Sequence, residues 1–181
     1  MKRIIFISLG IITIVFAGVV LINNVNKKPK ENTSQIQNQT VQPPQIEEEK
    51  INYLTGFAIF TNRLKRSFAN SKYYNLSKRV YIKADNPNIV HVEKRGVTWD
   101  DFFKTLPMRV TYDCLTTGDG EIFCTNEKES LKFYLNGRKV DNFLDREIKD
   151  GDRALITFGS ENEDQIQLQM GQVANPREIK R

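Results

Sequence analysis

The sequence predicts an α+β protein that consists of a transmembrane helix, a flexible linker and a β-rich domain. Residues 4–22 carry hardly a polar group, which is typical of a membrane-spanning helix. Residues 23–50 are polar, with a tract of Gln, Asn and Thr, a Pro-Pro pair and an acidic run, and such a composition buries too little apolar surface to fold. In residues 51–181 short β-like runs alternate with turn sequences.

The apolar segment is long enough to cross a bilayer once. A helix over residues 4–22 would be about 28 Å long, at about 1.5 Å per residue, which is close to the roughly 30 Å of the hydrocarbon core. A cleaved signal peptide has a shorter apolar run that ends in a small-residue site, whereas residues 19–22 lead directly into Asn23 and Asn24. The sequence therefore favours an uncleaved signal anchor.

Basic residues flank both ends of this segment: Lys2 and Arg3 in residues 1–3, and Lys27, Lys28 and Lys30 after it. The positive-inside rule alone therefore does not fix the orientation. A short N-terminal tail, one span and a long hydrophilic region form the usual layout of an anchor that exports the hydrophilic region. We expect a single-pass protein of the cell membrane, with residues 51–181 forming an extracytoplasmic domain.

The charge balance argues against a nucleic-acid-binding protein. The chain has 181 residues and a net charge of +5. The five flanking residues account for this excess, because the other 22 basic side chains are matched by 22 acidic ones. The basic character therefore belongs to the membrane flanks, and nucleic acid is not an expected partner.

Turn sequences divide the β-rich part into hairpins. Strands at 57–60 and 64–68 are expected to pair across Thr61-Asn62, and strands at 79–84 and 89–93 across a turn at 85–88. Further strands are expected at 109–115, at 121–125, at 131–135 before the Asn136-Gly137 turn, and at 153–158 after a turn at 150–152.

Two short helices are also predicted. Trp99, Phe102, Phe103 and Leu106 form one apolar stripe at helical spacing, with Thr98 as N-cap opposite Asp101 and Pro107 at the end. A C-terminal helix of about ten residues is expected after Ser160-Glu161-Asn162-Glu163, which matches a capping box.

The order of these elements resembles the β-grasp (ubiquitin-like) fold. The run LKFYLNGRKVDNFLDREIKDGDRALITF, at 131–158, is similar to the corresponding part of sulfur-carrier β-grasp proteins and of transcobalamin-like extracellular β-grasp domains. The resemblance implies a β-grasp-like core over about residues 79–158, with extra hairpins and a short C-terminal helix around it. A sulfur-carrier role is not expected, because that chemistry needs a C-terminal Gly-Gly and this sequence ends in Ile179-Lys180-Arg181.

A closer resemblance is to uncharacterised membrane-anchored proteins of small-genome bacteria and archaea. It is carried by the run GVTWDDFF at 96–103, by the cysteine hairpin and by the segment after Leu131, and it covers about residues 55–170. These relatives tend to carry His-x-His pairs in the strands before the helix. This chain has Tyr81-Ile82-Lys83 and His91-Val92-Glu93 there, which argues against the metal role that the family implies.

Cys114 and Cys124 are the only cysteines, and their midpoint is the centre of Gly118-Asp119-Gly120. In a hairpin centred there they face each other with Cβ atoms about 4.5–5.5 Å apart, close enough for a disulfide. A disulfide agrees with an oxidising, extracytoplasmic location. A thiol-disulfide oxidoreductase is the alternative, but the chain lacks the Cys-x-x-Cys at a helix N-terminus that lowers a thiol pKa.

His91 is the only histidine. On a strand at 89–93 it would share a face with Ile89 and Glu93, where packing against Glu93 explains it. His91 and Glu93 could also offer two ligands to a metal, so a metal-binding surface domain is a further alternative. The sequence itself predicts neither a metal site nor a cofactor.

Residues 51–97 hold nine basic and only two acidic side chains. Seven of these basic residues are interleaved with aromatic ones and form a candidate patch for an anionic ligand: Arg63, Lys65, Arg66, Lys72, Lys78, Arg79 and Lys83. A solvated strand face explains the same pattern. Candidate partners are envelope polymer, lipid headgroups or another surface protein.

The sequence thus favours a non-enzymatic role. We expect a membrane-anchored, extracytoplasmic binding or interaction domain that is stabilised by one disulfide. An envelope enzyme remains the alternative class, and no catalytic residues are predicted.

Overall fold

The computed structural model describes residues 50–179. The transmembrane helix expected at 4–22 and nearly all of the linker expected at 23–50 lie outside the described residues. Within residues 50–179, no helix is long and apolar enough to cross a membrane.

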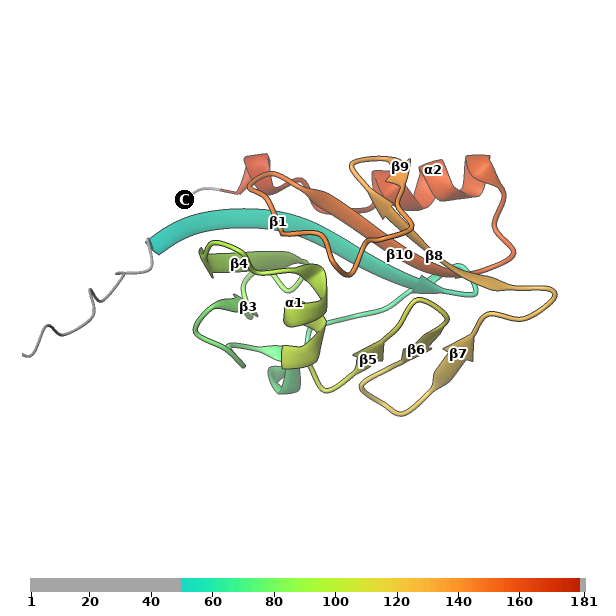
Figure 1. The fold of residues 1–181 in the computed structure, drawn as a ribbon, viewed down its shortest axis with the longest axis horizontal. Helices are drawn as coiled ribbons and strands as arrows, with labels where there is room; N and C mark the ends of the chain where they lie inside the picture. Colours follow the sequence, from blue (N-terminus) through green and yellow to red (C-terminus); the bar gives the residue numbers. More distant parts are fainter. Residues whose placement is uncertain (1–49, 180–181) are drawn as a thin grey trace, which may run out of the picture. The chain divides into compact units, whose positions relative to one another are not determined.

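The described part is a mixed α+β structure with mostly strands and two α-helices (Figure 1). Its main sheet has seven strands, in the order β3-β4-β1-β10-β8-β9, with β2 paired to β1. Their bounds are β1 Lys50–Thr61, β2 Leu64–Lys65, β3 Val80–Ile82, β4 Ile89–Lys94, β8 Ser130–Leu135, β9 Arg138–Lys139 and β10 Arg153–Gly159. β1 and β10 pair in parallel, and the other pairs named in this sheet are antiparallel.

A helix packs on each face of this sheet. Successive side chains of a strand point to opposite faces, and on β1 Phe57 and Ile59 join the large core that includes α1 (Trp99–Thr105). Ala58 and Phe60 instead join a smaller cluster that includes α2 (Glu163–Gly171). β1 is therefore buried on both sides over its second half.

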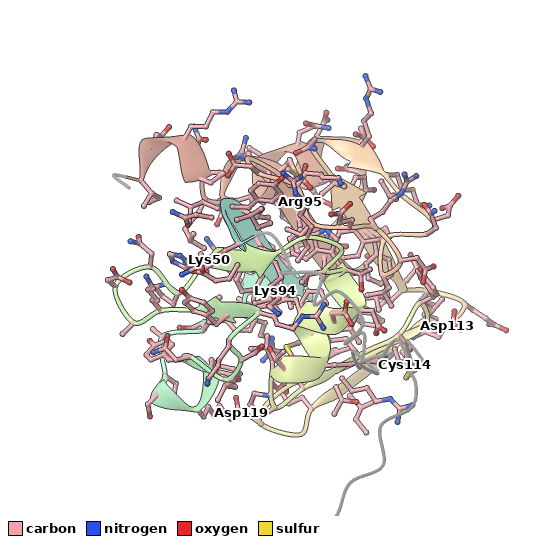
Figure 2. All side chains as sticks on the ribbon, turned by 60° about the vertical axis from the view of Figure 1, so that its left-hand side comes forward. Lys50, Lys94, Arg95, Asp113, Cys114 and Asp119 are labelled. Carbon is pink, nitrogen blue, oxygen red and sulfur yellow. A yellow bond between two sulfur atoms is a disulfide. The ribbon has the colours of Figure 1, made fainter. Side chains whose placement is uncertain are left out.

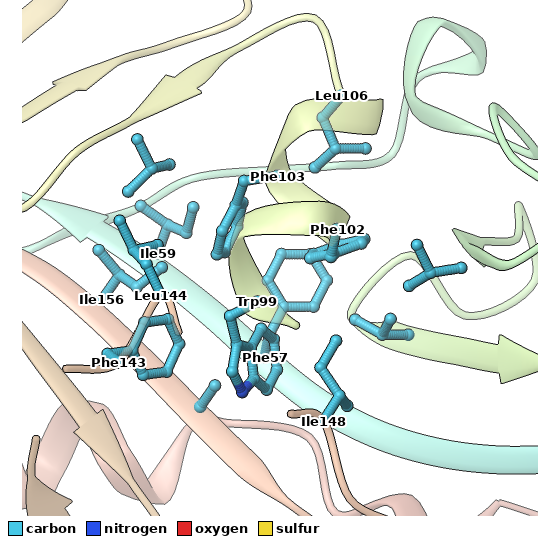
Figure 3. Close-up of a cluster of buried hydrophobic side chains, with 14 of the residues drawn as sticks. Phe57, Ile59, Trp99, Phe102, Phe103, Leu106, Phe143, Leu144, Ile148 and Ile156 are labelled. Atoms are coloured by element: carbon cyan, nitrogen blue, oxygen red, sulfur yellow. The ribbon is translucent and has the colours of Figure 1, made fainter. Parts of the chain in front are cut away.

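The large core is built around the aromatic residues of α1 (Figure 3). Trp99 stacks on Phe143 with ring centroids 5.1 Å apart, and Phe102 contacts Phe57 edge-on at 5.3 Å. The predicted cap is confirmed, since Thr98 and Asp101 form a reciprocal capping box. The helical stripe in the sequence is thus a core-facing stripe in the structure.

Helix α2 forms where a C-terminal helix was expected, but its N-cap lies two residues later than the expected one. Asn162 is the N-cap and forms the capping box with Gln165, rather than Ser160 with Glu163. At the other end, Arg153 of β10 donates hydrogen bonds from Nη2 to the carbonyl oxygens of Met170 (2.9 Å) and Val173 (2.7 Å). These bonds attach the end of α2 and the residues after it to β10.

The expected hairpins form, with different strand lengths. β1 starts at Lys50 instead of residue 57, and β2 has two residues instead of the five expected at 64–68. The strand expected at 109–115 is split into β5 (Arg109–Val110) and β6 (Cys114–Thr116), because Thr111 Oγ1 accepts a hydrogen bond from the Cys114 amide and turns the chain. β5, β6 and β7 (Ile122–Cys124) form a separate three-stranded sheet.

The turns at 136–137 and 150–152 connect the central strands of the main sheet through hydrogen bonds. Asn136 and Gly137 both have positive φ, 54° and 81°, as a tight hairpin turn requires. Asn136 Nδ2 donates to the buried Asp152 carboxylate at 2.9 Å, and its Oδ1 accepts from the Arg153 amide at 2.9 Å. The Leu54 amide donates to Asp150 Oδ1 at 2.9 Å. The turn at 150–152 therefore ties β1, β10 and the β8–β9 hairpin together.

Candidate functional site

Two adjoining cavities lie beside the β3–β4 hairpin. The first has a volume of about 560 Å³ and the second about 340 Å³, and both are lined by Lys50, Lys83 and Glu93. We call this continuous surface the lysine groove. Its charged and aromatic lining residues are Lys50, Lys78, Tyr81, Lys83, Asp85, His91, Glu93 and Lys94.

The pairing of β3 with β4 forms the floor of the lysine groove. Tyr81 and His91 are register partners, and their rings stack nearly parallel, 5.2 Å apart and inclined by 6°. Val80, Ile82, Val90 and Val92 alternate with them and are buried in the large core. One face of the hairpin thus anchors the strands, while the other presents the two rings.

Glu93 connects the floor to the start of β1. Its Oε1 accepts a hydrogen bond from the Tyr81 hydroxyl at 3.0 Å, and its Oε2 lies 3.3 Å from Lys50 Nζ. Lys83 Nζ lies over the Tyr81 ring, 5.7 Å from its centroid. The carboxylate therefore holds Tyr81 and Lys50 in place and offsets one of the four lysine charges around the first cavity.

Burial and the nearby lysine set the ionisation of the two rings. Burial lowers the pKa of His91, and the charge of Lys83 lowers it further. Burial raises the pKa of Tyr81, and the hydrogen bond to Glu93 adds to that increase. At neutral pH both rings are uncharged, so the positive charge of the groove comes from lysines. The ammonium groups of these lysines can hold an anion.

The candidate anionic-ligand patch divides into two groups in the structure. Lys78 and Lys83 line the lysine groove, together with Lys50 and Lys94, which the sequence reasoning missed. β1 and β4 place Lys50 opposite Lys94 in register, and both residues are labelled in Figure 2. Composition gives no signal for such cross-strand neighbours.

The second group surrounds a different cavity, and its charges have partners. Lys65 Nζ donates to the Gln172 carbonyl at 2.9 Å. Arg66 pairs with Glu121 and covers the Phe123 ring at 5.0 Å. Lys72 pairs with Asp119 at 2.6 Å, and this hydrogen bond raises the Lys72 pKa. The exposed Arg63 and Arg79 line neither of these cavities.

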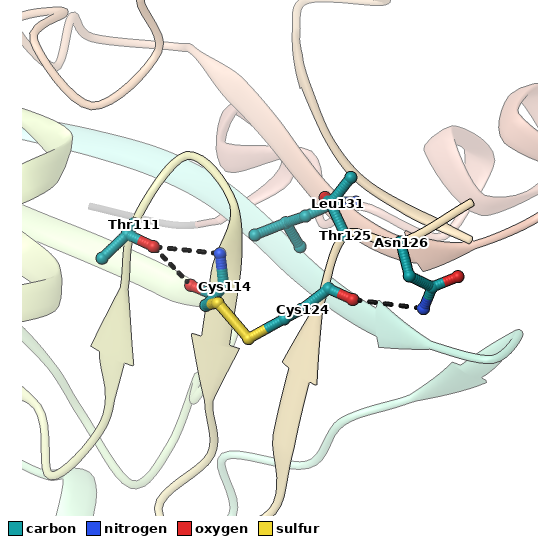
Figure 4. Close-up of a disulfide and its surroundings, with 6 residues drawn as sticks. All are labelled: Thr111, Cys114, Cys124, Thr125, Asn126 and Leu131. Carbon is teal, nitrogen blue, oxygen red and sulfur yellow. Dashed lines mark hydrogen bonds between the residues drawn. A yellow bond between two sulfur atoms is a disulfide. The ribbon is translucent and has the colours of Figure 1, made fainter. Parts of the chain in front are cut away.

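The expected disulfide is present. Cys114 of β6 and Cys124 of β7 are register partners and are bonded, with Cα atoms 4.1 Å apart (Figure 4). Beside it, Thr111 Oγ1 accepts a hydrogen bond from the Cys114 amide at 2.9 Å, and the Cys124 carbonyl accepts one from Asn126 Nδ2 at 3.3 Å. The two cysteines of the sequence therefore carry no free thiol.

His91 and Glu93, the two candidate metal ligands, share one face of β4 as expected. His91 contacts Tyr81 with its ring, and Glu93 binds Tyr81 and Lys50. Among residues 50–179 there is no group of three or more His, Cys, Asp or Glu side chains that could hold a metal ion.

Comparison with known proteins gave no relatives. No family model, no curated protein and no solved structure matches this chain. The resemblance to membrane-anchored β-grasp-like proteins therefore stays a prediction.

Proposed function

We propose that the protein is a single-pass membrane protein that carries a β-grasp-like binding domain outside the cell, and that the lysine groove of this domain binds phosphate groups. The observation that carries the proposal is the gathering of Lys50, Lys78, Lys83 and Lys94 around one cavity with Glu93 as its one acidic lining residue. The role is binding rather than catalysis.

The sheet order supports the β-grasp part of the proposal. A β-grasp fold pairs its first and last strands in parallel at the centre of the sheet, and its helix follows the first hairpin. Here β1 is parallel to β10, β4 is antiparallel to β1, and α1 follows β4. On this proposal the core begins with β1 at Lys50, before the range 79–158, and β3 is an addition at the sheet edge.

Phosphate suits the lysine groove better than a planar carboxylate does. A lysine ammonium is a compact point charge with three donors and no fixed plane, and the groove contains no arginine among its lining residues. A phosphate group offers several acceptor oxygens to ammonium groups that approach from different strands. The groove is also open, so a phosphate on a larger molecule can reach it.

Two sources of phosphate fit this site: the headgroups of anionic lipids and a phosphate-bearing envelope polymer. Lys50 begins β1, where the chain arrives from the predicted linker. The groove therefore includes the residue at which the predicted linker joins β1, and both sources would be available to a domain that is tethered to a membrane.

The test uses the full-length chain in an uncharged detergent and polyphosphate as the probe. Replacing Lys78 and Lys83 by Ala is expected to weaken polyphosphate binding about tenfold, since each charge in a partly exposed site contributes up to about 1 kcal/mol. The matched control replaces the exposed Lys128 and Lys139 and should leave the affinity unchanged. Equal affinities for the two double variants would overturn the proposed site.

Nanodiscs separate the two sources. If lipid headgroups occupy the groove, phosphatidylglycerol nanodiscs will compete with polyphosphate for the reconstituted chain, whereas nanodiscs of phosphatidylcholine alone will not. If a polymer is the source, polyphosphate will bind the chain with equal affinity in the phosphatidylglycerol and the phosphatidylcholine nanodiscs.

The orientation is tested on intact cells with a membrane-impermeant maleimide. Because Cys114 and Cys124 are bonded, an external domain will be labelled only after treatment with an impermeant reductant. Labelling that requires cell lysis but no reductant would place the domain inside and overturn the proposal.

A further inference from the structure

A separate cavity of about 400 Å³ lies between the β1–β2 hairpin and the disulfide-bonded β6–β7 hairpin. Its volume falls in the range of about 300–1,000 Å³ that is typical of small-molecule sites. It shares no lining residue with the lysine groove. The two are therefore distinct surfaces.

The inner wall of this cavity is apolar and comes from several elements. Ile59 lies on β1, Tyr73 on the 3₁₀ helix η1 (Ser71–Tyr73) and Leu115 on β6, while Phe68 and Met108 lie in loops. Phe68 and Tyr73 meet edge-on with ring centroids 5.1 Å apart. Aromatic and thioether side chains of this kind accept flat apolar groups.

The mouth of the cavity is polar, and two of its three charged lining residues are basic. Lys65 and Arg66 line it, with Asp119 as the one acidic lining residue. A lysine ammonium has three donors, and Lys65 Nζ has one acceptor among the described residues, the Gln172 carbonyl at 2.9 Å. Lys65 therefore retains donors for an anionic group.

We propose that this cavity binds a small organic anion with a compact apolar body, such as an arylalkanoate. The apolar body packs against Phe68, Tyr73 and Met108, and the carboxylate binds at the mouth to Lys65. The combination of an apolar wall and a basic mouth is the observation that selects this ligand class.

The disulfide supports one wall of the cavity. Leu115, Thr117, Gly118 and Asp119 line it directly after Cys114. Gly118 packs so tightly that a methyl group there would lie 2.3 Å from the Tyr73 hydroxyl. Reduction of the Cys114–Cys124 bond should loosen this wall and weaken ligand binding.

The three methionines of the sequence provide the measurement. In the full-length chain labelled at the methionine methyl carbons, Met108 reports on the cavity, and Met170, a buried residue of α2, serves as an internal control. Titration with 4-phenylbutyrate in an uncharged detergent should shift the Met108 signal saturably and leave Met170 in place. A Met108 shift that does not saturate, or equal shifts of both signals, would overturn the proposal.

The dependence of binding on charge is tested by changing the charge of the protein and, separately, the charge of the ligand. The Lys65→Gln variant should weaken 4-phenylbutyrate binding about threefold to fivefold, whereas Lys78→Gln, in the lysine groove, should not change it. The neutral 4-phenylbutyramide should bind the wild-type chain more weakly than the carboxylate. If the amide binds as tightly as the carboxylate, or if the two variants behave alike, the mouth does not select anions and the proposal fails. An unchanged Met170 signal verifies that each variant is folded.

Discussion

Gly56 on β1 and Ala174 lie so close together that a methyl group on Gly56 would be 1.9 Å from the Ala174 carbonyl oxygen. Ala174 belongs to the segment between α2 and the 3₁₀ helix η2 (Pro176–Glu178). This segment therefore packs directly on the backbone of the central strand. It continues to Ile179, which lines the second cavity of the lysine groove, so the same contact positions one wall of the proposed site.

The Gly56→Ala variant should be destabilised by about 1–3 kcal/mol, because backbone atoms have to move to relieve the overlap. Chemical denaturation of the full-length chain measures this change. Gly171→Ala is the matched control, since nothing lies within 4 Å of a methyl group there, and Ala in a helix is equally or more stable than Gly. Equal stabilities of the two variants would show that the segment after α2 does not rest on β1.

Removing the disulfide should cost about 3 kcal/mol in the chain-entropy model, because the bond closes a short loop with a sequence separation of 10. The Cys114→Ala/Cys124→Ala variant should lose this stability without a change in fold. Dithiothreitol should lower the melting temperature of the wild-type chain and have no effect on the variant. An unchanged melting temperature of the wild-type chain in dithiothreitol would contradict the stabilising role of the disulfide.

A buried ion pair lies beneath α2. Lys132 Nζ is 3.0 Å from Glu161 Oε2, and their side chains are 11% and 0% exposed. Burial alone would raise the pKa of Glu161, but the hydrogen bond and charge of Lys132 outweigh it and lower that pKa. Lys132→Met should cost about 3–5 kcal/mol, because it leaves a buried carboxylate unpaired.

The double variant Lys132→Met/Glu161→Gln should recover part of that loss, since no unpaired charge remains. Denaturation of both single variants and the double variant gives the coupling free energy. Strict additivity of the two single losses would mean that the ion pair is not coupled in the folded state.

His91 should make the stability of the protein depend on pH. Its pKa is lowered in the folded state by burial and by Lys83, so the unfolded chain binds a proton more readily. This contribution is fully present above about pH 6.5, the unfolded value, and is lost as the pH falls towards the folded pKa. Thermal melts from pH 8 to pH 5 should show this decline in the wild-type chain and a smaller one in the His91→Gln variant. Identical profiles would argue against the burial of His91.

Local patterns in the sequence were sufficient for the elements that neighbouring residues determine. The spacing of Cys114 and Cys124 about one turn predicted their register, and the Thr98 cap with its aromatic stripe predicted α1. The Asn136-Gly137 pair predicted the β8–β9 turn. In each case the partners are close in the sequence, so composition and spacing carry the signal.

The pairing of strands that are far apart in the sequence could not be predicted from local patterns. The parallel pairing of β1 with β10 joins Gly56 to Arg153, and nothing local to either strand specifies it. The first half of β1 was missed because Gly56 weakens a strand pattern, although close packing against Ala174 requires a glycine there. Of the four lysines in the groove, only Lys78 and Lys83 were in the predicted patch. Lys50 was missed because its place beside Lys94 depends on the pairing of β1 with β4, which is also a long-range contact.

The most direct test of the lysine groove uses the only histidine of the chain as a reporter. His91 lines the groove beside Lys50 and Lys83, and its pKa can be measured by NMR in the full-length chain with and without saturating polyphosphate. A phosphate bound to these lysines would offset the charge that lowers the His91 pKa, so we expect the His91 pKa to rise on binding. An unchanged His91 pKa at saturation would contradict binding in the groove.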